Sequence, residues 1–273
     1  MNTWLRMVEQ LTLEAYKNDW KAIPIEECGD PLAEIFPAHC YPYYAKEMGL
    51  THDYRVFARS FAVDRFELAR SLLEMHFRSK YRLVAYDGWR SIAVQENLFY
   101  SILLKFTVPN FSGGKYQEQF KGAKAFGDIR SVFLGLSSEA QDELRAENCK
   151  YVSLPSKDPA RPSPHATGGA LDVWLWDAEE NVPADMGVPF DHMSEEAGTF
   201  YHLRSNRKLF GSPEEDAKVC QRRESMIGSM INAGFTCYPH EFWHFNIGNQ
   251  MDSLAAGGLP AQYGYIEPGW QES

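Results

Sequence analysis

Apolar residues recur along the chain with two different periods, and these periods predict where helices and strands lie. Close to the N-terminus they return every three or four residues, as they do in a helix that buries one face. The residues of this apolar stripe are Trp4, Val8, Leu11 and Ala15. The same period predicts a second helix from Asp64 to about Phe77.

The clearest helix signal lies in the last quarter of the chain. Ser212 is a typical N-cap residue, Pro213 suits the first helical position, and Glu215 is placed to complete a capping box. The helix is predicted to end near Ala233, because Gly234 is typical of the position just after a helix. The sequence therefore defines both ends of this helix.

Two further helices and a loop are predicted in the middle of the chain. A helix with an apolar face is expected from Ile92 to about Phe106. Another begins at Ser137 or Ser138, where Gln141 is a candidate for a capping box. The polar, glycine-containing residues 109–130 between these helices are expected to form a mobile loop.

Short segments rich in β-forming residues predict the strands. They cover residues 82–87, 170–176, 235–238 and 242–247. Helices and strands are grouped along the chain rather than strictly alternating, which disfavours a parallel sheet built from βαβ units. We therefore expect an α+β fold with a small, mainly antiparallel sheet and flanking helices.

Length and composition favour one globular domain. The chain has 273 residues, of which 44% are hydrophobic and 23% charged, so it is neither disordered nor fibrous. A chain of this length buries a core large enough to fold without a structural metal or disulfide, so a metal would serve chemistry. We expect a single domain over residues 1–273, with residues 1–60 as an N-terminal arm and residues 64–248 as the core.

Charge and apolar content also limit the possible partners. The 27 basic and 37 acidic residues give a net charge of −10, which argues against binding to nucleic acid. No apolar stretch approaches the roughly 20 residues of a membrane helix, and the N-terminus lacks the apolar centre of a signal peptide. The five cysteines are scattered without a C-x-x-C pair, as expected of free thiols. We therefore expect a cytoplasmic protein without nucleic-acid or membrane partners, and the oligomeric state is left open.

The first segment with candidate chemistry joins a loop to the predicted strand at residues 170–176. His165 precedes Asp172 by seven positions, and the glycines at 168 and 169 allow a tight turn between them. Asp172 shares a strand face with Trp174 and Trp176, so its carboxylate lies in an otherwise apolar row. A charge there is costly unless it is paired or bound to a metal.

The second segment contains Glu241 and His244. These residues would point to opposite faces of a regular strand, so a bend or bulge near Glu241 is required if both act at one site. Together, His165, Asp172 and His244 would give a metal three ligands and leave a fourth position for water. That pattern is typical of catalytic zinc, and it makes Glu241 the base for the water.

A third segment, residues 86–90, places Arg90 after the predicted strand at residues 82–87. Its guanidinium would suit an oxyanion. Two histidines and a carboxylate also occur in non-haem Fe(II) oxygenases, although the H-x-D spacing of those enzymes is absent and they do not need Glu241.

Two widely separated motifs resemble those of zinc peptidases that cut D-amino-acid bonds in bacterial cell-wall peptides. The first motif is S-x-H-x-x-G-x-A-x-D over residues 163–172, and the second is E-x-W-H over residues 241–244. Residues 86–90 and 185–191 further resemble the D-alanyl-D-alanine dipeptidases, including those of vancomycin resistance. The resemblance covers roughly residues 64–248, and Pro164 departs from the small polar residue usual at that position.

This resemblance implies a function and a set of site residues. It implies one zinc ion per chain, held by His165, Asp172 and His244. Glu241 is implied as the catalytic base and Arg90 as the stabiliser of the tetrahedral intermediate, while Ser163 and Asp191 would hold the ends of a small dipeptide substrate. We therefore expect zinc-dependent hydrolysis of D-Ala-D-Ala or a similar dipeptide.

Two alternatives share the same metal set. One is a D,D- or L,D-carboxypeptidase or endolysin that acts on cell-wall peptides through an open groove. The other is a non-catalytic, zinc-bearing binding module on the same scaffold, against which the presence of Glu241 and Arg90 argues.

Overall fold

A computed structural model describes residues 3–77, 80–156 and 158–268 of the chain. Contacts between residues divide the chain into two compact units. The first comprises Met1–Trp89 with Asp158–Ser273, and the second comprises Arg90–Lys157.

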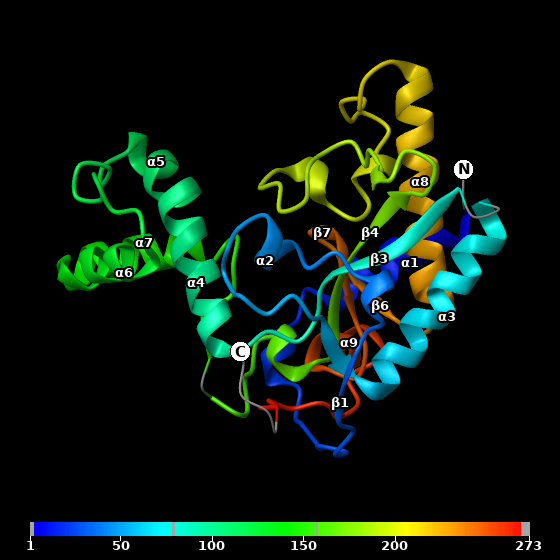
Figure 1. Ribbon diagram of the computed structural model, residues 1–273, viewed down its shortest axis with the longest axis horizontal. Helices are drawn as coiled ribbons and strands as arrows, with labels where there is room; N and C mark the ends of the chain where they lie inside the picture. The colour runs from blue at the N-terminus through cyan, green and yellow to red at the C-terminus, as the bar shows by residue number, and fades with distance from the viewer. Residues whose placement is uncertain (1–2, 78–79, 157, 269–273) are drawn as a thin grey trace. The chain divides into compact units, whose positions relative to one another are not determined.

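The first unit is built on an antiparallel sheet (Figure 1). Four strands follow one another across it in the order β3-β4-β7-β6, and β5 pairs with β4. Their bounds are Tyr81–Asp87 for β3, Ala170–Asp177 for β4, Val182–Pro183 for β5, Thr236–Tyr238 for β6 and Glu241–Asn246 for β7. The predicted α+β class and the four predicted strands are confirmed, while the short β5 was not predicted.

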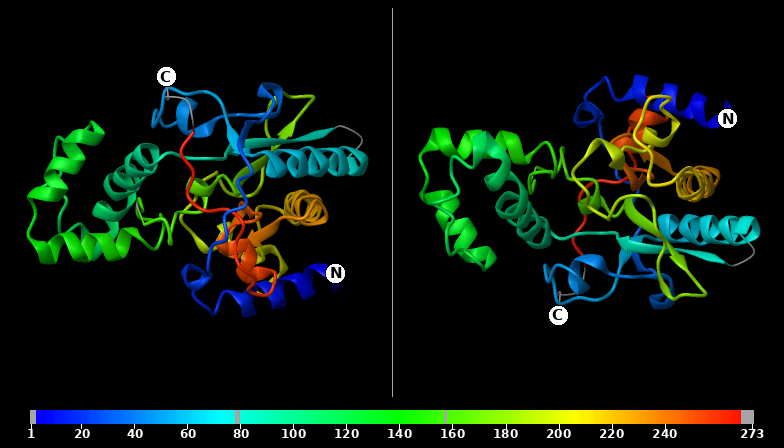
Figure 2. Two further views of the ribbon diagram at one scale, coloured as in Figure 1. Left: turned by 90° about the horizontal axis from the view of Figure 1, so that it is seen from below. Right: turned by 90° about the horizontal axis from the view of Figure 1, so that it is seen from above.

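Strand β4 separates an apolar core from a face that carries polar groups. Its residues Leu171, Val173 and Leu175 are fully buried, and the pleat turns Asp172 and Trp174 to the opposite face. Helices α3, Ser60–Phe77, and α8, Pro213–Asn232, pack against each other and against the sheet (Figures 1 and 2). The sheet therefore presents Asp172 on a rigid, well-packed support.

Helix α8 has the ends that the sequence predicts. Ser212 is the N-cap, and its hydroxyl accepts a hydrogen bond from the backbone N–H of Glu215, whose side chain completes the capping box. Pro213 is the first helical residue. The left-handed φ of 99° at Gly234 ends the helix.

Helix α1, Thr3–Ala15, forms where it was predicted, but the predicted buried face is wrong. Leu5 and Thr12 are its buried residues, whereas Trp4 and Leu11 are exposed. The two stripes differ by one position, which is a turn of about 100° on a helix. In Figure 2, α1 lies beside the unpredicted helix α9, Gln250–Ala255.

The N-terminal arm contains more regular structure than the sequence predicts. Strands β1, Leu32–Glu34, and β2, Phe57–Arg59, form a two-stranded antiparallel sheet, and helix α2 spans Tyr43–Lys46. The buried guanidinium of Arg59 donates to the Glu27 carboxylate within the arm and to the carbonyl of Thr167, which links the arm to the rest of the first unit.

The second unit is helical. Its helices are α4 at Ile92–Ile102, α5 at Val108–Asn110, α6 at Phe126–Gly135 and α7 at Ser138–Asn148, with a π-helical turn at Leu103–Thr107 after α4. Buried Asn148 links α7 to α4 by donating to the carbonyl of Phe99 and accepting from the Thr107 hydroxyl.

Two sequence predictions for this unit need correction. The expected loop at residues 109–130 is wrong at both ends, because α5 extends to Asn110, and α6 begins at Phe126 and buries Ile129. Gln141 forms no capping box: Ser137 is the N-cap and accepts from the N–H of Ala140, so Gln141 is one residue too far along. None of the helices in the described part of the chain has the length and apolar character needed to cross a membrane.

Candidate active site

Two potential metal ligands lie opposite one another on neighbouring strands. Strand β4 pairs with β7 so that Asp172 faces His244. Side chains directly opposite each other in an antiparallel pair project to the same face. Nδ1 of His244 accordingly lies 3.0 Å from Oδ1 of Asp172.

His165 reaches the same point from the loop before β4. It begins the 3₁₀ turn His165–Thr167, which ends at Gly168 with a φ of 71°. A side chain on Gly168 would also meet Leu32 at 2.7 Å, so this tight turn requires glycine. Nε2 of His165 thereby comes to 3.2 Å from Nδ1 of His244 and 3.4 Å from Oδ2 of Asp172.

Oxygen acceptors fix the orientation of both imidazole rings. Nδ1 of His165 lies 2.7 Å from the carbonyl oxygen of Gly88, and Nε2 of His244 lies 3.2 Å from Oδ1 of Asn246. Because each acceptor needs an N–H, the other nitrogen of each neutral ring carries a lone pair. In this arrangement the two lone pairs and the Asp172 carboxylate converge on one point, which suits a bound cation.

The spacing of these atoms fits a tetrahedral metal ion. Nitrogen and oxygen ligands of such an ion lie roughly 3.3 Å apart, and the three distances here are 3.0, 3.2 and 3.4 Å. All three residues are buried, with exposures of 3% to 6%. Among the residues that the structure describes, these three form a group that could hold a metal ion. A tetrahedral ion bound to them would keep a fourth position for water.

Glu241 lies beside this group of three residues. Strand β7 bulges between two of its pairings with β6, since Tyr238 pairs with Glu241 but Cys237 pairs with Phe245. The bulge that the sequence required is therefore present, and it brings Oε2 of Glu241 to 4.0 Å from Nδ1 of His244. The Glu241 side chain is 31% exposed, so its carboxylate is accessible to water.

Comparison with known proteins identifies the family. A family model described as D-Ala-D-Ala dipeptidase matches residues 125–264, more than half of the chain. The chain belongs to the D-Ala-D-Ala dipeptidase family. A D-alanyl-D-alanine dipeptidase of Synechocystis sp. is 28% identical over 239 residues, which are 84% of this chain and 87% of that protein. The predicted resemblance is thus confirmed, and the chain is a peptidase by family.

Two residues that contact the ligands of this dipeptidase-family site were not predicted from the sequence. A bulge between β3 and β4 pairs Asp87 with Asp172, and Oδ2 of Asp87 lies 3.2 Å from Nδ1 of His165. Asn246 orients His244, as described above. Ligating histidines usually donate their second N–H to a carboxylate or carbonyl. That rule calls for such partners, but the sequence alone does not say which residues they are.

Ser163 and Asp191 are the two residues that were predicted to hold the ends of a substrate. Ser163 is buried two residues before His165. Asp191 has a φ of 57°, in the left-handed region, and Oδ1 of its carboxylate accepts a hydrogen bond of 3.2 Å from the Tyr44 hydroxyl. Their roles in holding the ends of a substrate stay predictions.

Arg90 is the first residue of the second unit. Its buried guanidinium donates from Nη1 to Oε1 of Gln95 over 2.6 Å, and Nε2 of Gln95 donates to the carbonyl of Ser153. Arg90 lies outside residues 125–264, which the dipeptidase family model matches. Its action on an oxyanion stays a prediction of the resemblance.

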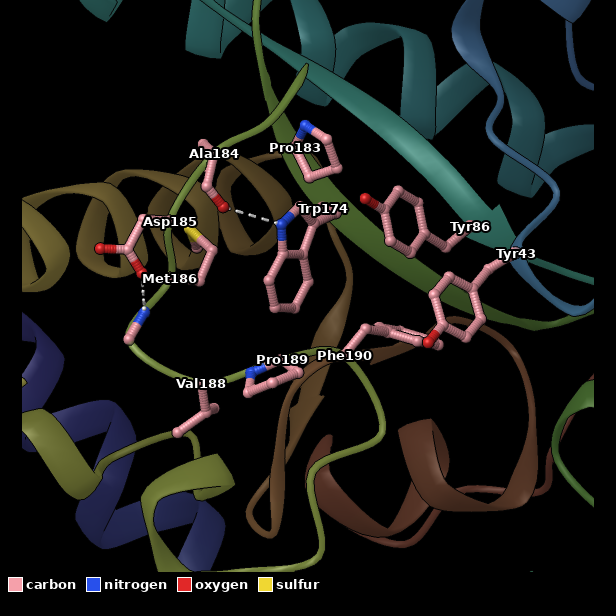
Figure 3. Close-up of a pocket in the computed structure, with 11 residues that line it drawn as sticks. Tyr43, Tyr86, Trp174, Pro183, Ala184, Asp185, Met186, Val188, Pro189 and Phe190 are labelled. Atoms are coloured by element: carbon pink, nitrogen blue, oxygen red, sulfur yellow. Dashed lines mark hydrogen bonds between the residues drawn. The ribbon is translucent and has the colours of Figure 1, made fainter. Parts of the chain in front are cut away.

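An aromatic cavity of about 390 Å³ lies further along β4 (Figure 3). Trp174, two residues after Asp172, forms part of it together with residues 183–190, which run from the end of β5 into the following loop. Its aromatic lining consists of Tyr43, Tyr86, Trp174 and Phe190. Tyr86 stacks on Trp174, and the ring of Phe190 packs edge-on against both. In this dipeptidase-family chain, the strand face that carries Asp172 therefore continues into an apolar pocket.

Proposed function

We propose that this chain is a zinc-dependent dipeptidase that hydrolyses D-Ala-D-Ala or a similar short dipeptide. Family membership supports the reaction class. The observation that carries the proposal is the convergence of His165, Asp172 and His244 around one buried point, with Glu241 beside it. These three residues would hold one zinc ion per chain through two nitrogens and one carboxylate oxygen.

Zinc would supply a water whose pKa is lowered to about 7 and a positive charge next to the scissile carbonyl. Glu241 would accept the proton of that water as it attacks the carbonyl carbon. The same carboxyl group would then give the proton to the departing amine, so that the peptide bond breaks without free acid or base. Asp87 and Asn246 would keep the histidine rings in their ligating orientation.

The substrate would be held by groups that the family resemblance suggests. Asp191 would accept the free ammonium group of the dipeptide, because an unpaired buried charge is costly. Ser163 would bind near the other end, and Arg90 would stabilise the oxyanion that develops on the carbonyl. A free amino terminus would then distinguish a dipeptide from the end of a longer cell-wall peptide.

A panel of substrates tests this function. The purified protein would be offered D-Ala-D-Ala, L-Ala-L-Ala, N-acetyl-D-Ala-D-Ala and a pentapeptide that ends in D-Ala-D-Ala, and free alanine would be measured. We expect hydrolysis of D-Ala-D-Ala and at least tenfold slower hydrolysis of its N-acetylated form.

The other outcomes distinguish the alternatives. Faster cleavage of the pentapeptide than of the dipeptide would assign the chain to the carboxypeptidases. Stoichiometric zinc without hydrolysis of any peptide would support a binding module instead.

A further inference from the structure

Arg223 is a buried cation on helix α8 that the proposed chemistry does not use. It is fully buried, and its guanidinium lies between two aromatic rings, 3.8 Å from the centroid of Phe242 and 4.4 Å from that of Phe210. Among the described residues, no carboxylate lies within ion-pair distance of it. Burial lowers the pKa of Arg223 to about 9, so the group is still charged at neutral pH. A buried charge without a counter-ion is costly, so the hydrogen bonds of the guanidinium must stabilise it.

The hydrogen bonds of Arg223 reach both ends of one loop. Nε donates to the carbonyl of Met186 over 2.8 Å, and Nη1 donates to the carbonyl of Glu196 over 2.8 Å. Residues 187–193 between these ends belong to no helix or strand. We call residues 186–196 the Asp191 loop. One planar guanidinium thus fixes the separation of the two ends of this loop.

The Asp191 loop presents two groups to the proposed substrate site. Phe190 packs against Trp174 and Trp243 and lines the aromatic cavity seen in Figure 3. Asp191 follows with its left-handed backbone and its hydrogen bond from Tyr44. A non-glycine residue keeps such a backbone only where its surroundings enforce it. Fixed loop ends provide that constraint.

We propose that Arg223 is a positioning residue for substrate recognition, which clamps both ends of the Asp191 loop and so places Asp191 for the amino group of the dipeptide. The inference rests on the proposed function, because it assumes that Asp191 binds the substrate. The proposal predicts that loss of Arg223 affects substrate binding and not the chemical step, because Arg223 contacts the loop, whereas zinc ligation depends on β4, β7 and the turn at His165.

The main test replaces Arg223 by an apolar side chain of similar length. Arg223→Met fills the space between the rings and removes only the charge and the donors. We expect KM for D-Ala-D-Ala to rise roughly 10- to 100-fold, with kcat within about threefold and one zinc per chain retained. Amide hydrogen exchange should accelerate in residues 186–196 and stay unchanged in β4 and β7.

Two further variants separate the clamp from other roles. Arg222→Met removes the neighbouring arginine, whose Nη1 donates to the carbonyl of Asp185 just outside the loop, and we expect KM within about threefold of the wild-type value. Arg223→Lys keeps the charge but has no planar fork, so KM should remain raised by about fivefold or more. Arg223→Lys also tests the proposal if Arg223→Met does not fold.

Specific outcomes would overturn the proposal. Unchanged KM and unchanged loop exchange in Arg223→Met would show that the clamp has no role in an active enzyme. Full recovery of KM in Arg223→Lys would mean that charge alone matters, and faster exchange throughout the first unit would indicate a merely structural role. If the wild-type protein hydrolyses no dipeptide, the proposed function fails, whereas loop exchange in Arg223→Met still tests the clamp itself.

Discussion

Asn246 orients the ring of His244: Nε2 of the histidine donates to Oδ1 of the asparagine over 3.2 Å, from two residues away on the same strand. Nδ2 of Asn249 donates to the same oxygen, which fixes the amide with its oxygen towards the ring. This contact leaves Nδ1 of His244 to face Asp172 and His165.

Removing this acceptor should weaken metal binding without touching a ligand. We expect Asn246→Leu to raise the Kd for zinc roughly 10- to 100-fold, as loss of a hydrogen-bond partner to a ligating histidine does. Asn246→Asp keeps an oxygen acceptor and should stay within a few-fold of the wild type. Competition with a chromophoric chelator measures both, and equal affinity of Asn246→Leu and the wild type would contradict the assignment.

Replacing Glu241 should separate chemistry from metal binding. Glu241→Gln removes the group that moves the proton but leaves His165, Asp172 and His244 in place. We expect full zinc content and a loss of kcat of about 10²- to 10⁴-fold. Exposed His240 precedes Glu241, so His240→Gln is a matched control that should keep its activity. Activity of Glu241→Gln within a few-fold of the wild type would show that another group is the base.

Asp191 should contribute to recognition of the free amino group. A charge-assisted hydrogen bond contributes about 1.5 to 3 kcal/mol, so Asp191→Asn should lower kcat/KM for D-Ala-D-Ala roughly 10- to 150-fold. N-acetylation of the substrate should reduce cleavage by the wild type at least as much, and cleavage by the variant far less, because both changes remove one interaction. Equal cleavage of free and N-acetylated substrate by the wild type would assign the protein to the carboxypeptidases.

His202 should make the fold sensitive to acid. It lies in the 3₁₀ turn Tyr201–Leu203, and its side chain is fully buried. Burial lowers its pKa to about 3, with further contributions from the positive charges of Arg223 and Arg207. The unfolded chain has an ordinary histidine pKa of about 6.5 and so binds a proton that the folded protein excludes between these two values. The stability due to neutral His202 is therefore complete above pH 6.5 and is lost as the pH falls towards 3.

Urea unfolding at pH 7, 6, 5 and 4 measures this effect. His202 should lower the free energy of unfolding by about 1.4 kcal/mol for each pH unit below its unfolded pKa. His202→Gln cannot take up the proton, so its stability should fall less steeply with pH. Parallel pH profiles for the two proteins would show that His202 does not titrate on unfolding.

The sequence predicts best those features that local chemistry determines. The N-cap Ser212 and the glycine after α8 fix that helix through bonds made within a few residues. The group His165, Asp172 and His244 was expected from two short motifs, and the turn at Gly168 is local, whereas the pairing of β4 with β7 that sets Asp172 opposite His244 joins residues 72 positions apart. The bulge near Glu241 was required by the periodicity of a strand, and it is present.

The features that sequence reasoning missed depend on distant contacts. The buried face of α1 is set by what packs against it, and it includes the polar residue Thr12, which an apolar periodicity does not select. Asp87 meets His165 across 78 positions of the chain through a bulge in β3. The two hydrogen bonds from Arg223 to the Asp191 loop likewise join a helix to main-chain carbonyls. Every residue has such a carbonyl, so the sequence cannot indicate which ones accept these bonds.

Zinc reconstitution tests the central claim most directly. The metal-free protein, His165→Ala and His244→Ala would each be titrated with zinc, and bound metal and D-Ala-D-Ala hydrolysis would be measured on the same samples. We expect the wild-type chain to bind one zinc ion and to gain activity in proportion, and both variants to lose tight binding and all activity, since three ligands are needed for a tight site with an open position. Full zinc binding by both variants, or undiminished hydrolysis by the metal-free wild type, would contradict the account.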